Sequence, residues 1–443
     1  MKKAVYILLS AAALLGFSNR PANAQNQNFK YRRSSLSMVL IESKSFPNKD
    51  AVTSSWNNYP FPDKYNAHDI KTKSLNIEEV KLSDADLLEA GYLKDTLKNQ
   101  LAVSKAEIAQ KQLRYLNDSK TQAVVLPSEK KAYQLKIDKM IKEQKIANQM
   151  VATWFDLGNN NKFDMELVQK RGFYNASELE ASIAKGQSRG MASLGDAGEE
   201  LLNNTFVTFT KFEFIENEPI AKAAKEIAIK EINKKMAGKP GFLIAAAKKA
   251  AEETYNKAKE GYSLWSKTWL YQLDWNDSIA NTFYSTLWNH PENLMSSDLF
   301  KLKFVGTQYN QSLVTFNLGK QRTQEQIIDL ALVRNVDNAF AKLQKQNEVF
   351  KPKVPVLSTH PITAQIGMKE GLKGGEKFEV LEMTYNSKTG HTEYKVIGTA
   401  TVNKKHVWDN RYNAGEESND EMHATPFKGS KKIQPGMLLK LKK

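Results

Sequence analysis

The fold of this chain is decided by the stretch 148–215, NQMVATWFDLGNNNKFDMELVQKRGFYNASELEASIAKGQSRGMASLGDAGEELLNNTFVTFTKFEFI. The stretch predicts the end of a helix, a polar turn, a short strand, a second helix, a glycine-rich bend and an apolar strand. In the last segment, 204–215, aromatic residues occur on both alternating faces, which is typical of a central strand covered on both sides. We therefore expect an α/β (α+β) domain, with helices packed on a mixed sheet.

The residues before this stretch predict an N-terminal arm over 25–75. A strand is expected at 36–41, and the passage WNNYPFPDKYNAHD follows it. Pro60 and Pro62 interrupt regular pairing there, so we expect an ordered but irregular arm that wraps onto the next domain. Its aromatic residues could form a sugar- or protein-binding platform, but such residues more often plug into their own core. They are Trp56, Tyr59, Phe61 and Tyr65.

The α/β domain is expected to span 76–350. Helices are predicted by apolar residues spaced three and four apart, and strands by short apolar runs between turn residues. The predicted helices are 84–116, 128–154, 278–289 and 323–348, and the predicted strands are 121–126, 268–275, 299–305 and 313–318.

A helical hairpin is predicted to interrupt this domain at 217–262. Two helices rich in lysine and alanine flank the turn Gly238-Lys239-Pro240-Gly241. Basic amphipathic helices can lie on anionic membranes. The apolar line here is narrow, however, and 242–244 is available to pack it, so the sequence favours a hairpin packed on its own domain.

The spacing of apolar residues changes after 351–355, where Pro352 and Pro355 predict a stiff linker. Short alternating runs separated by glycine turns then fill 356–443, with a hairpin turn at 386–390. We expect a small all-β domain there, either a barrel or a sandwich.

The first 24 residues have the pattern of a secretory signal peptide. Lys2 and Lys3 precede an apolar run over 4–17, and Ala22-Asn23-Ala24 offers small residues for cleavage. The run is short for a membrane anchor, which is the alternative. We expect a mature chain from Gln25 in the periplasm or at the outer membrane, where the absence of cysteine excludes both lipidation and disulfides.

The chain is strongly basic, with a formal net charge of +15. Removal of Lys2, Lys3 and Arg20 with the signal leaves +12. For an exported protein this charge favours anionic lipid, acidic glycan or an acidic protein over nucleic acid. The alternative is a solvated lysine-rich surface that only confers solubility.

No catalytic, cofactor-binding or metal-binding residue is assigned from the sequence. The six histidines occur singly, and no serine lies in a G-x-S-x-G elbow. Asp156, Asn160, Asp164 and Glu166 carry oxygen donors at the even spacing that suits calcium. Asn161 stands where an EF-hand needs glycine and Leu167 where it needs glutamate, so an Asn-rich turn is favoured.

The densest polar and aromatic cluster is 406–412, HVWDNRY, which precedes an acidic loop, GEESNDE. It could bind a ligand, but a structural stack of Trp408 on Arg411 at a strand end is favoured. This cluster is therefore not assigned as a site.

Two runs carry a resemblance to a known group of proteins. WFDLGNNNKFDMELVQKRGFYNAS and LGDAGEELLNNTFVTFTKF resemble the core of the curli-secretion and peptidoglycan-synthase-activator lipoproteins. IGMKEGLKGGEKFEVLE is similar to a β module of envelope and flagellar-assembly proteins, and the whole chain resembles secreted proteins of Gram-negative anaerobes. The chain departs from the curli lipoproteins in lacking a lipidated cysteine. The resemblance implies a non-enzymatic envelope protein.

The sequence thus predicts an assembly or scaffold protein of the periplasm or outer membrane that recognises another envelope component, expected to be a protein, through a basic surface. The alternative is a secreted binding module for acidic glycan or anionic lipid, whose binding should fall steeply with salt. A hydrolase would instead need a deep pocket in which two distant carboxylates converge with perturbed pKa values. No cofactor is expected.

Overall fold

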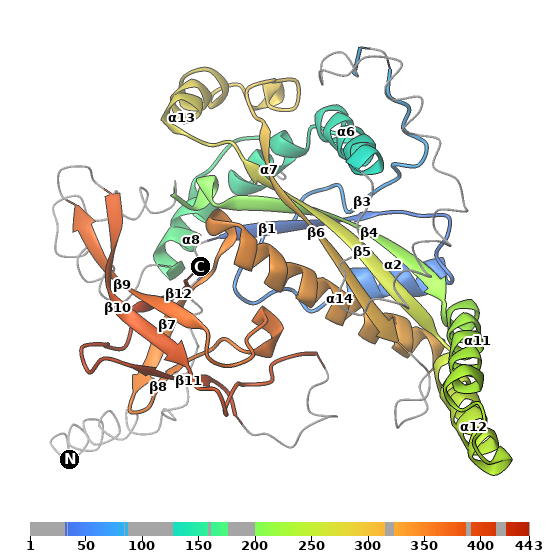
Figure 1. The fold of residues 1–443 in the computed structure, drawn as a ribbon. Helices are drawn as coiled ribbons and strands as arrows, with labels where there is room; N and C mark the ends of the chain where they lie inside the picture. The colour runs from blue at the N-terminus through green and yellow to red at the C-terminus, as the bar shows by residue number, and fades with distance from the viewer. Residues whose placement is uncertain are drawn as a thin grey trace, which may run out of the picture. The chain divides into compact units, whose positions relative to one another are not determined.

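The structure is a computed structural model that describes residues 32, 34–83, 85–86, 127–157, 161–175, 200–314, 323–386, 391–412 and 422–442. It confirms the predicted fold class, because a mixed sheet with packed helices carries a helical-hairpin insertion and a C-terminal all-β domain follows it (Figure 1). The predicted signal peptide, the strand 121–126 and nearly all of the helix 84–116 lie outside the described residues.

The main sheet has the order β2-β1-β4-β5-β6, and β3 also pairs with β1. β1 runs parallel to β4, whereas β4, β5 and β6 are antiparallel neighbours. The strands are β1 (Ser35–Ile41), β2 (Asn66–Ala67), β3 (Ser74–Leu75), β4 (Thr205–Glu216), β5 (Tyr262–Leu273) and β6 (Leu302–Val314).

The N-terminal arm is more regular than the sequence predicts. It supplies the interior strand β1, the helix α2 (Lys49–Asn57) and two short strands, so the prediction of an irregular arm over 25–75 is wrong. Pro60 and Pro62 lie between α2 and β2, where they remove no hydrogen bond from the sheet.

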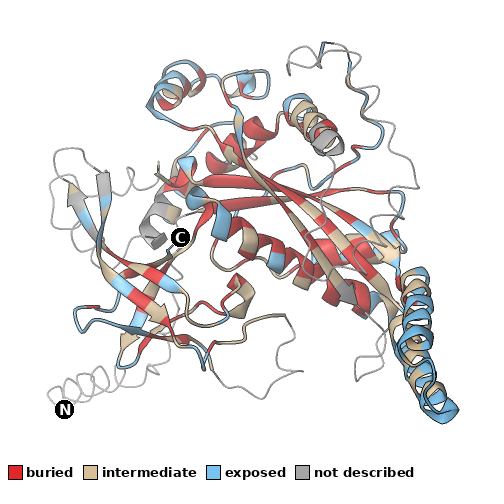
Figure 2. Cartoon of the chain, in the orientation of Figure 1, coloured by how far each residue is buried: buried red, intermediate tan, exposed pale blue. Residues whose placement is uncertain are grey.

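Helices cover the sheet on both faces (Figures 1 and 2). Val207 and Phe209 of β4 enter one core with α6, α7, α8 and α13, whereas Phe206 and Phe212 enter a second core with α2 and α14. The prediction of a doubly covered central strand is confirmed. The helices are α6 (Pro127–Glu143), α7 (Ile146–Trp154), α8 (Glu166–Asn175), α13 (Asp277–Thr282) and α14 (Gln324–Gln346), and α13 continues into a π-helical turn, η2 (Phe283–Leu287).

Three predicted elements differ from the structure. The helix 128–154 is broken before α7 at Lys145, whose φ of 51° lies in the left-handed region. The short strand predicted after the polar turn is replaced by α8. The two strands predicted at 299–305 and 313–318 are parts of one strand, β6, which runs from Leu302 to Val314. β5 also pairs with the polar residues between the two predicted ranges, and the pairing has a single bulge next to Gly306.

The C-terminal domain is a closed barrel with strand order β10-β11-β8-β7-β12-β9, and not a sandwich. The linker predicted at 351–355 is wrong, because β7 begins at Lys353 and Pro355 pairs with Leu438. The extended backbone that a proline imposes on the residue before it is also that of a strand. The strands are β7 (Lys353–Thr359), β8 (Ile362–Ala364), β9 (Lys377–Asn386), β10 (His391–Val402), β11 (Thr425–Gly429) and β12 (Leu438–Leu441).

A buried amide fixes α14 on the sheet. The Asn335 side chain is wholly buried, and its Nδ2 donates to the carbonyl of Leu264 and to Ser312 Oγ, both at 3.1 Å. Its Oδ1 accepts a hydrogen bond from Ser266 Oγ. These bonds tie one residue of α14 to both β5 and β6.

Replacing Asn335 with alanine should therefore destabilise the fold. Asn335→Ala leaves buried hydroxyl and carbonyl groups of the sheet without this partner, and we expect the free energy of unfolding to fall by about 3 kcal/mol. Urea unfolding followed by circular dichroism measures this change. Asn338 is exposed on the same helix, so Asn338→Ala is the control and should cost less than about 0.5 kcal/mol. Equal losses for the two variants would contradict this role.

Candidate functional site

The aromatic residues of the arm do not form an external platform. Trp56, Tyr59 and Tyr65 are buried. The Trp56 ring lies 5.8 Å from Phe212 of β4, and Tyr65 stacks on Phe350 with ring centroids 4.8 Å apart. The interpretation that these residues plug into their own core is confirmed.

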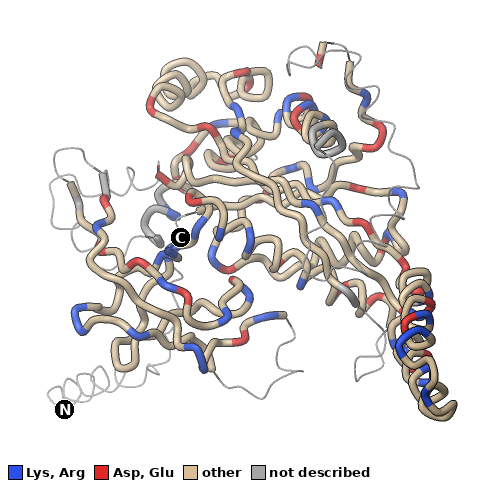
Figure 3. The backbone as a smooth tube through the Cα atoms, in the orientation of Figure 1, with Lys and Arg blue, Asp and Glu red and all other residues tan. Residues whose placement is uncertain are grey.

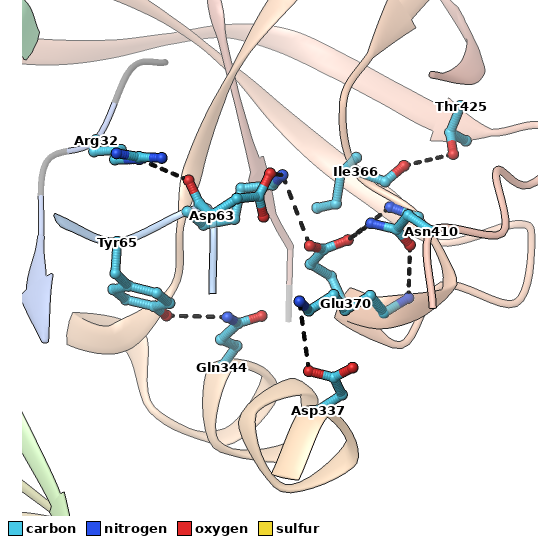
Figure 4. A network of polar contacts seen from close by, with 12 residues as sticks. Arg32, Asp63, Tyr65, Asp337, Gln344, Ile366, Glu370, Asn410 and Thr425 are labelled. Atoms are coloured by element: carbon cyan, nitrogen blue, oxygen red, sulfur yellow. Dashed lines mark hydrogen bonds and ion pairs between the residues drawn. The ribbon is translucent and has the colours of Figure 1, made fainter. Parts of the chain in front are cut away.

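A polar network joins the arm, α14 and the barrel (Figure 4). Lys64 lies 2.9 Å from Asp63 and 3.7 Å from Glu370 of the barrel. Glu370 Oε2 also accepts hydrogen bonds from the Gly367 amide and from Asn410 Nδ2, at 2.8 and 2.9 Å. Side chains from distant parts of the sequence therefore hold the barrel to the α/β domain.

Asp337 of α14 is the most perturbed carboxyl group of this network. Tyr59 donates a hydrogen bond of 2.6 Å to its Oδ1, and Lys369 lies 3.6 Å from the same atom. Burial raises the pKa of Asp337 to about 6, although the charge of Lys369 acts in the opposite direction. Asp337 Oδ1 thus has two partners from other parts of the fold, whereas its buried Oδ2 accepts no hydrogen bond from the described residues. The contacts join the arm, α14 and the barrel, so we interpret the network as a structural junction.

The cluster 406–412 belongs to the same junction. Asn410 Oδ1 accepts from the Lys369 amide, and Tyr412 donates to Asp329 of α14 at 2.8 Å. Arg411 forms a two-bond ion pair with Asp409. The Tyr412–Asp329 bond connects the barrel to α14, whereas the other two contacts lie within the barrel domain. The acidic loop that follows lies outside the described residues.

His68 and Arg171 form a second buried contact. His68 Nε2 lies 2.8 Å from the Met150 carbonyl, and Arg171 Nη1 lies 3.0 Å from His68 Nδ1. The Arg171 guanidinium also covers the ring of Trp154 at 4.6 Å. Burial, with the Arg171 charge as a second cause, lowers the pKa of His68 to about 3, so the imidazole is neutral in the folded protein.

The calcium pattern does not gather ligands in the described chain. Asp164 Oδ1 accepts the Glu166 amide at 2.9 Å and so begins α8. Asp156 and Asn161 have positive φ values of 44° and 48°, as is common in Asn- and Asp-rich turns. Asn160 lies outside the described residues, and no group of three potential metal-binding side chains occurs within them.

A hollow of about 770 Å³ lies between α6, α7 and the sheet. Tyr271 donates to Asp138 at 2.6 Å inside it, and burial raises the pKa of Asp138. The other carboxylates of the hollow lie beside lysines, as in Asp86–Lys139 and Asp298–Lys145. Among the described residues that line the hollow, each of these carboxylates is thus paired with a lysine or a tyrosine, whereas a hydrolase would need two free ones.

The helical hairpin is the most exposed element of the described chain. α11 (Asn217–Lys235) begins where β4 ends, and α12 (Gly241–Ala258) returns to β5 (Figure 1). No residue of α12 is buried, and in α11 only Asn217 and Ala221 are (Figure 2). The prediction that the hairpin packs on its own domain is wrong, because among the described elements each of its helices contacts mainly the other helix.

The base of the hairpin is held firmly. Asn217 donates to the Glu260 carbonyl at 2.9 Å and accepts from Ser263 Oγ at 3.0 Å. Further out, Lys225 lies 3.2 Å from Glu252 and 3.9 Å from the centre of the Tyr255 ring. One ion pair, Lys225–Glu252, thus joins the two helices in the basal half.

The distal half of the hairpin, defined as 230–249, is different. It has six lysines and one glutamate, a net charge of +5, whereas the basal residues 217–229 and 250–260 together have a net charge of −1 (Figure 3). Within the described chain, five of these lysines make no ion pair, and Lys235 pairs with Glu231. All six are exposed. They are Lys230, Lys234, Lys235, Lys239, Lys248 and Lys249.

The distal half also exposes large apolar side chains beside these lysines. Phe242 has 72% and Leu243 has 40% of its surface exposed. This basic and apolar tip is the candidate functional site. The sequence does show the lysines that are grouped around a glycine-rich turn. The spacing of apolar residues alone, however, does not show that the tip projects from the domain.

Comparisons with known proteins do not identify a related site. No family model matches the chain, and a search of curated proteins found no match. No helix of the described residues combines the length and the apolar character needed to cross a membrane.

The buried His68 predicts a pH dependence of stability. The unfolded chain takes up a proton near the ordinary pKa of 6.5, but the folded chain resists it down to about 3. Stability therefore falls as the pH drops through this window. His68→Gln keeps a donor and an acceptor but does not titrate, so its loss of stability between pH 7 and pH 4.5 should be smaller by about 2 kcal/mol.

Urea unfolding at the two pH values measures this difference. His290 is exposed, so His290→Gln should follow the unmodified protein and serves as the control. An unchanged pH dependence in His68→Gln would show that another group controls acid stability.

Proposed function

We propose that this chain is a non-enzymatic assembly or scaffold protein of the periplasm or outer membrane, which recognises another envelope component through the distal half of its hairpin. The observation that carries the proposal is the separation of charge along the hairpin. The basal half has a net charge of −1, whereas the distal half has a net charge of +5 beside exposed Phe242. Charge that only confers solubility has no reason to be concentrated in this way.

The rest of the fold supports a scaffold role. The β4–β5 ladder and the buried contacts of Asn217 fix the base of the hairpin on the sheet. The barrel is held to α14 by Lys369 and Asp337. A base fixed in this way would hold a projecting recognition element in place. The proposal also depends on the signal peptide expected at 1–24, which would direct the mature chain to the envelope.

A binding module for acidic glycan or anionic lipid is the alternative function. The concentrated lysines favour it as well, because both ligand classes are anionic. The two functions differ in the partner that is recovered from envelopes, which can be measured.

The proposal predicts that binding depends on the distal lysines. A tagged chain recovered from cross-linked, fractionated envelopes should carry a defined envelope component. The variant Lys239→Gln/Lys248→Gln should recover about thirtyfold less of it, because each of the two lysines near an anionic surface contributes about 1 kcal/mol. The basal variant Lys222→Gln/Lys257→Gln removes the same charge and should recover the normal amount.

Equal recovery by the distal and basal variants would contradict recognition through the tip. Recovery of no envelope component by the unmodified chain would contradict the assembly role itself. Recovery of glycan alone would favour the alternative function.

A further inference from the structure

The composition of the hairpin tip narrows the class of its partner. Protein interfaces are usually anchored by tryptophan, tyrosine and arginine. The distal half, 230–249, contains none of these residues and combines lysines with Phe242 and Leu243. Lysine and phenylalanine side by side are typical of segments that lie in the head-group region of anionic membranes.

The shape of the hairpin agrees with contact at its end. The middle of α12 is rich in alanine, as at 245–247 and 250–251, and offers no wide apolar stripe to a groove on a protein. The large exposed apolar groups are instead found at Phe242 and Leu243, in the first turn of α12. An 18-residue helix is about 27 Å long, so the tip reaches well beyond the ends of β4 and β5.

We infer that the hairpin tip binds the surface of an anionic phospholipid bilayer, with Phe242 and Leu243 inserted among the head groups and the distal lysines facing lipid phosphates. This inference rests on the proposed recognition through the distal half of the hairpin, and it names anionic lipid, a ligand class of the alternative function, as the component that the tip contacts. The lysines surround the apolar pair in the sequence, from Lys234 and Lys239 on one side to Lys248 on the other. Electrostatic attraction brings the tip to the surface, and burial of the apolar pair holds it there.

Vesicle binding tests this inference with the full mature chain. The protein should sediment with vesicles that mix phosphatidylglycerol and phosphatidylcholine in low salt, and should be released in high salt. It should not sediment with phosphatidylcholine alone. Lys239→Gln/Lys248→Gln should weaken binding about thirtyfold and Phe242→Ser about tenfold, whereas Lys222→Gln/Lys257→Gln should bind normally.

Insertion has a separate readout, because the chain contains no cysteine and a single introduced cysteine can be labelled alone. An environment-sensitive fluorophore on Ala245→Cys, next to the apolar pair, should shift to shorter wavelength when anionic vesicles are added. The same fluorophore on Asn256→Cys, in the basal half, should not shift. Both positions are exposed, so neither label disturbs a packed core.

The outcomes separate this inference from the proposed function. Absence of vesicle binding, together with a protein partner recovered from envelopes through the distal lysines, overturns the lipid inference and leaves the proposed function standing. If neither vesicle binding nor a protein partner is found, the lipid inference and the proposed function are both contradicted. Vesicle binding that does not depend on salt or on lipid charge also overturns the inference. An equal shift in the emission wavelength of the two fluorophores does so as well.

Discussion

The antiparallel pairing of β4 with β5 is the constraint on which the rest of the structure depends. The ladder runs without a bulge from Phe206 opposite Gln272 to Glu216 opposite Tyr262. Because the chain leaves the sheet after Glu216 and returns at Tyr262, this last pair fixes both ends of the hairpin. The hairpin tip, about 27 Å away, has a defined position only because the two ends of the hairpin are held in one register.

The same strands organise the two cores. Side chains that alternate along β4 enter opposite faces, so helices on both sides pack against one strand. α14 is oriented on its face by Asn335, and it then carries Asp337 to the junction with the barrel. Buried ion pairs such as Lys369–Asp337 contribute little net stability after desolvation, but an unpaired buried charge is costly. The junction therefore restricts how the barrel can sit on α14.

The sequence predicts the elements whose pattern is local. Three predicted elements are found close to their expected positions. They are the strand 204–215, which is apolar on both faces, the hairpin 217–262 and the helix 323–348. The sequence does not predict that β6 is continuous, because its polar middle is held in the sheet by pairing with β5. It also does not predict the strand that begins at Lys353, where pairing with β12 accommodates the prolines. Contacts such as His68–Arg171 and Lys64–Glu370 join residues far apart in the chain, and spacing contains no signal for them.

The candidate site shows the same division. Its lysines and its glycine turn can be read from the sequence, but their exposure depends on whether another element covers them. The apolar residues 242–244 suggest packing onto the domain, yet the ladder directs the helices beyond the sheet and leaves Phe242 exposed.

The central claim is that the distal half of the hairpin is the surface that meets the envelope. Lysine labelling with mass spectrometry, compared between the purified protein and intact envelopes, tests it most directly and does not presuppose lipid or protein. The account predicts that Lys234, Lys239 and Lys248 are protected in envelopes, while Lys222 and Lys257 of the basal half label equally in both. Equal labelling of the distal lysines in both preparations would contradict the account.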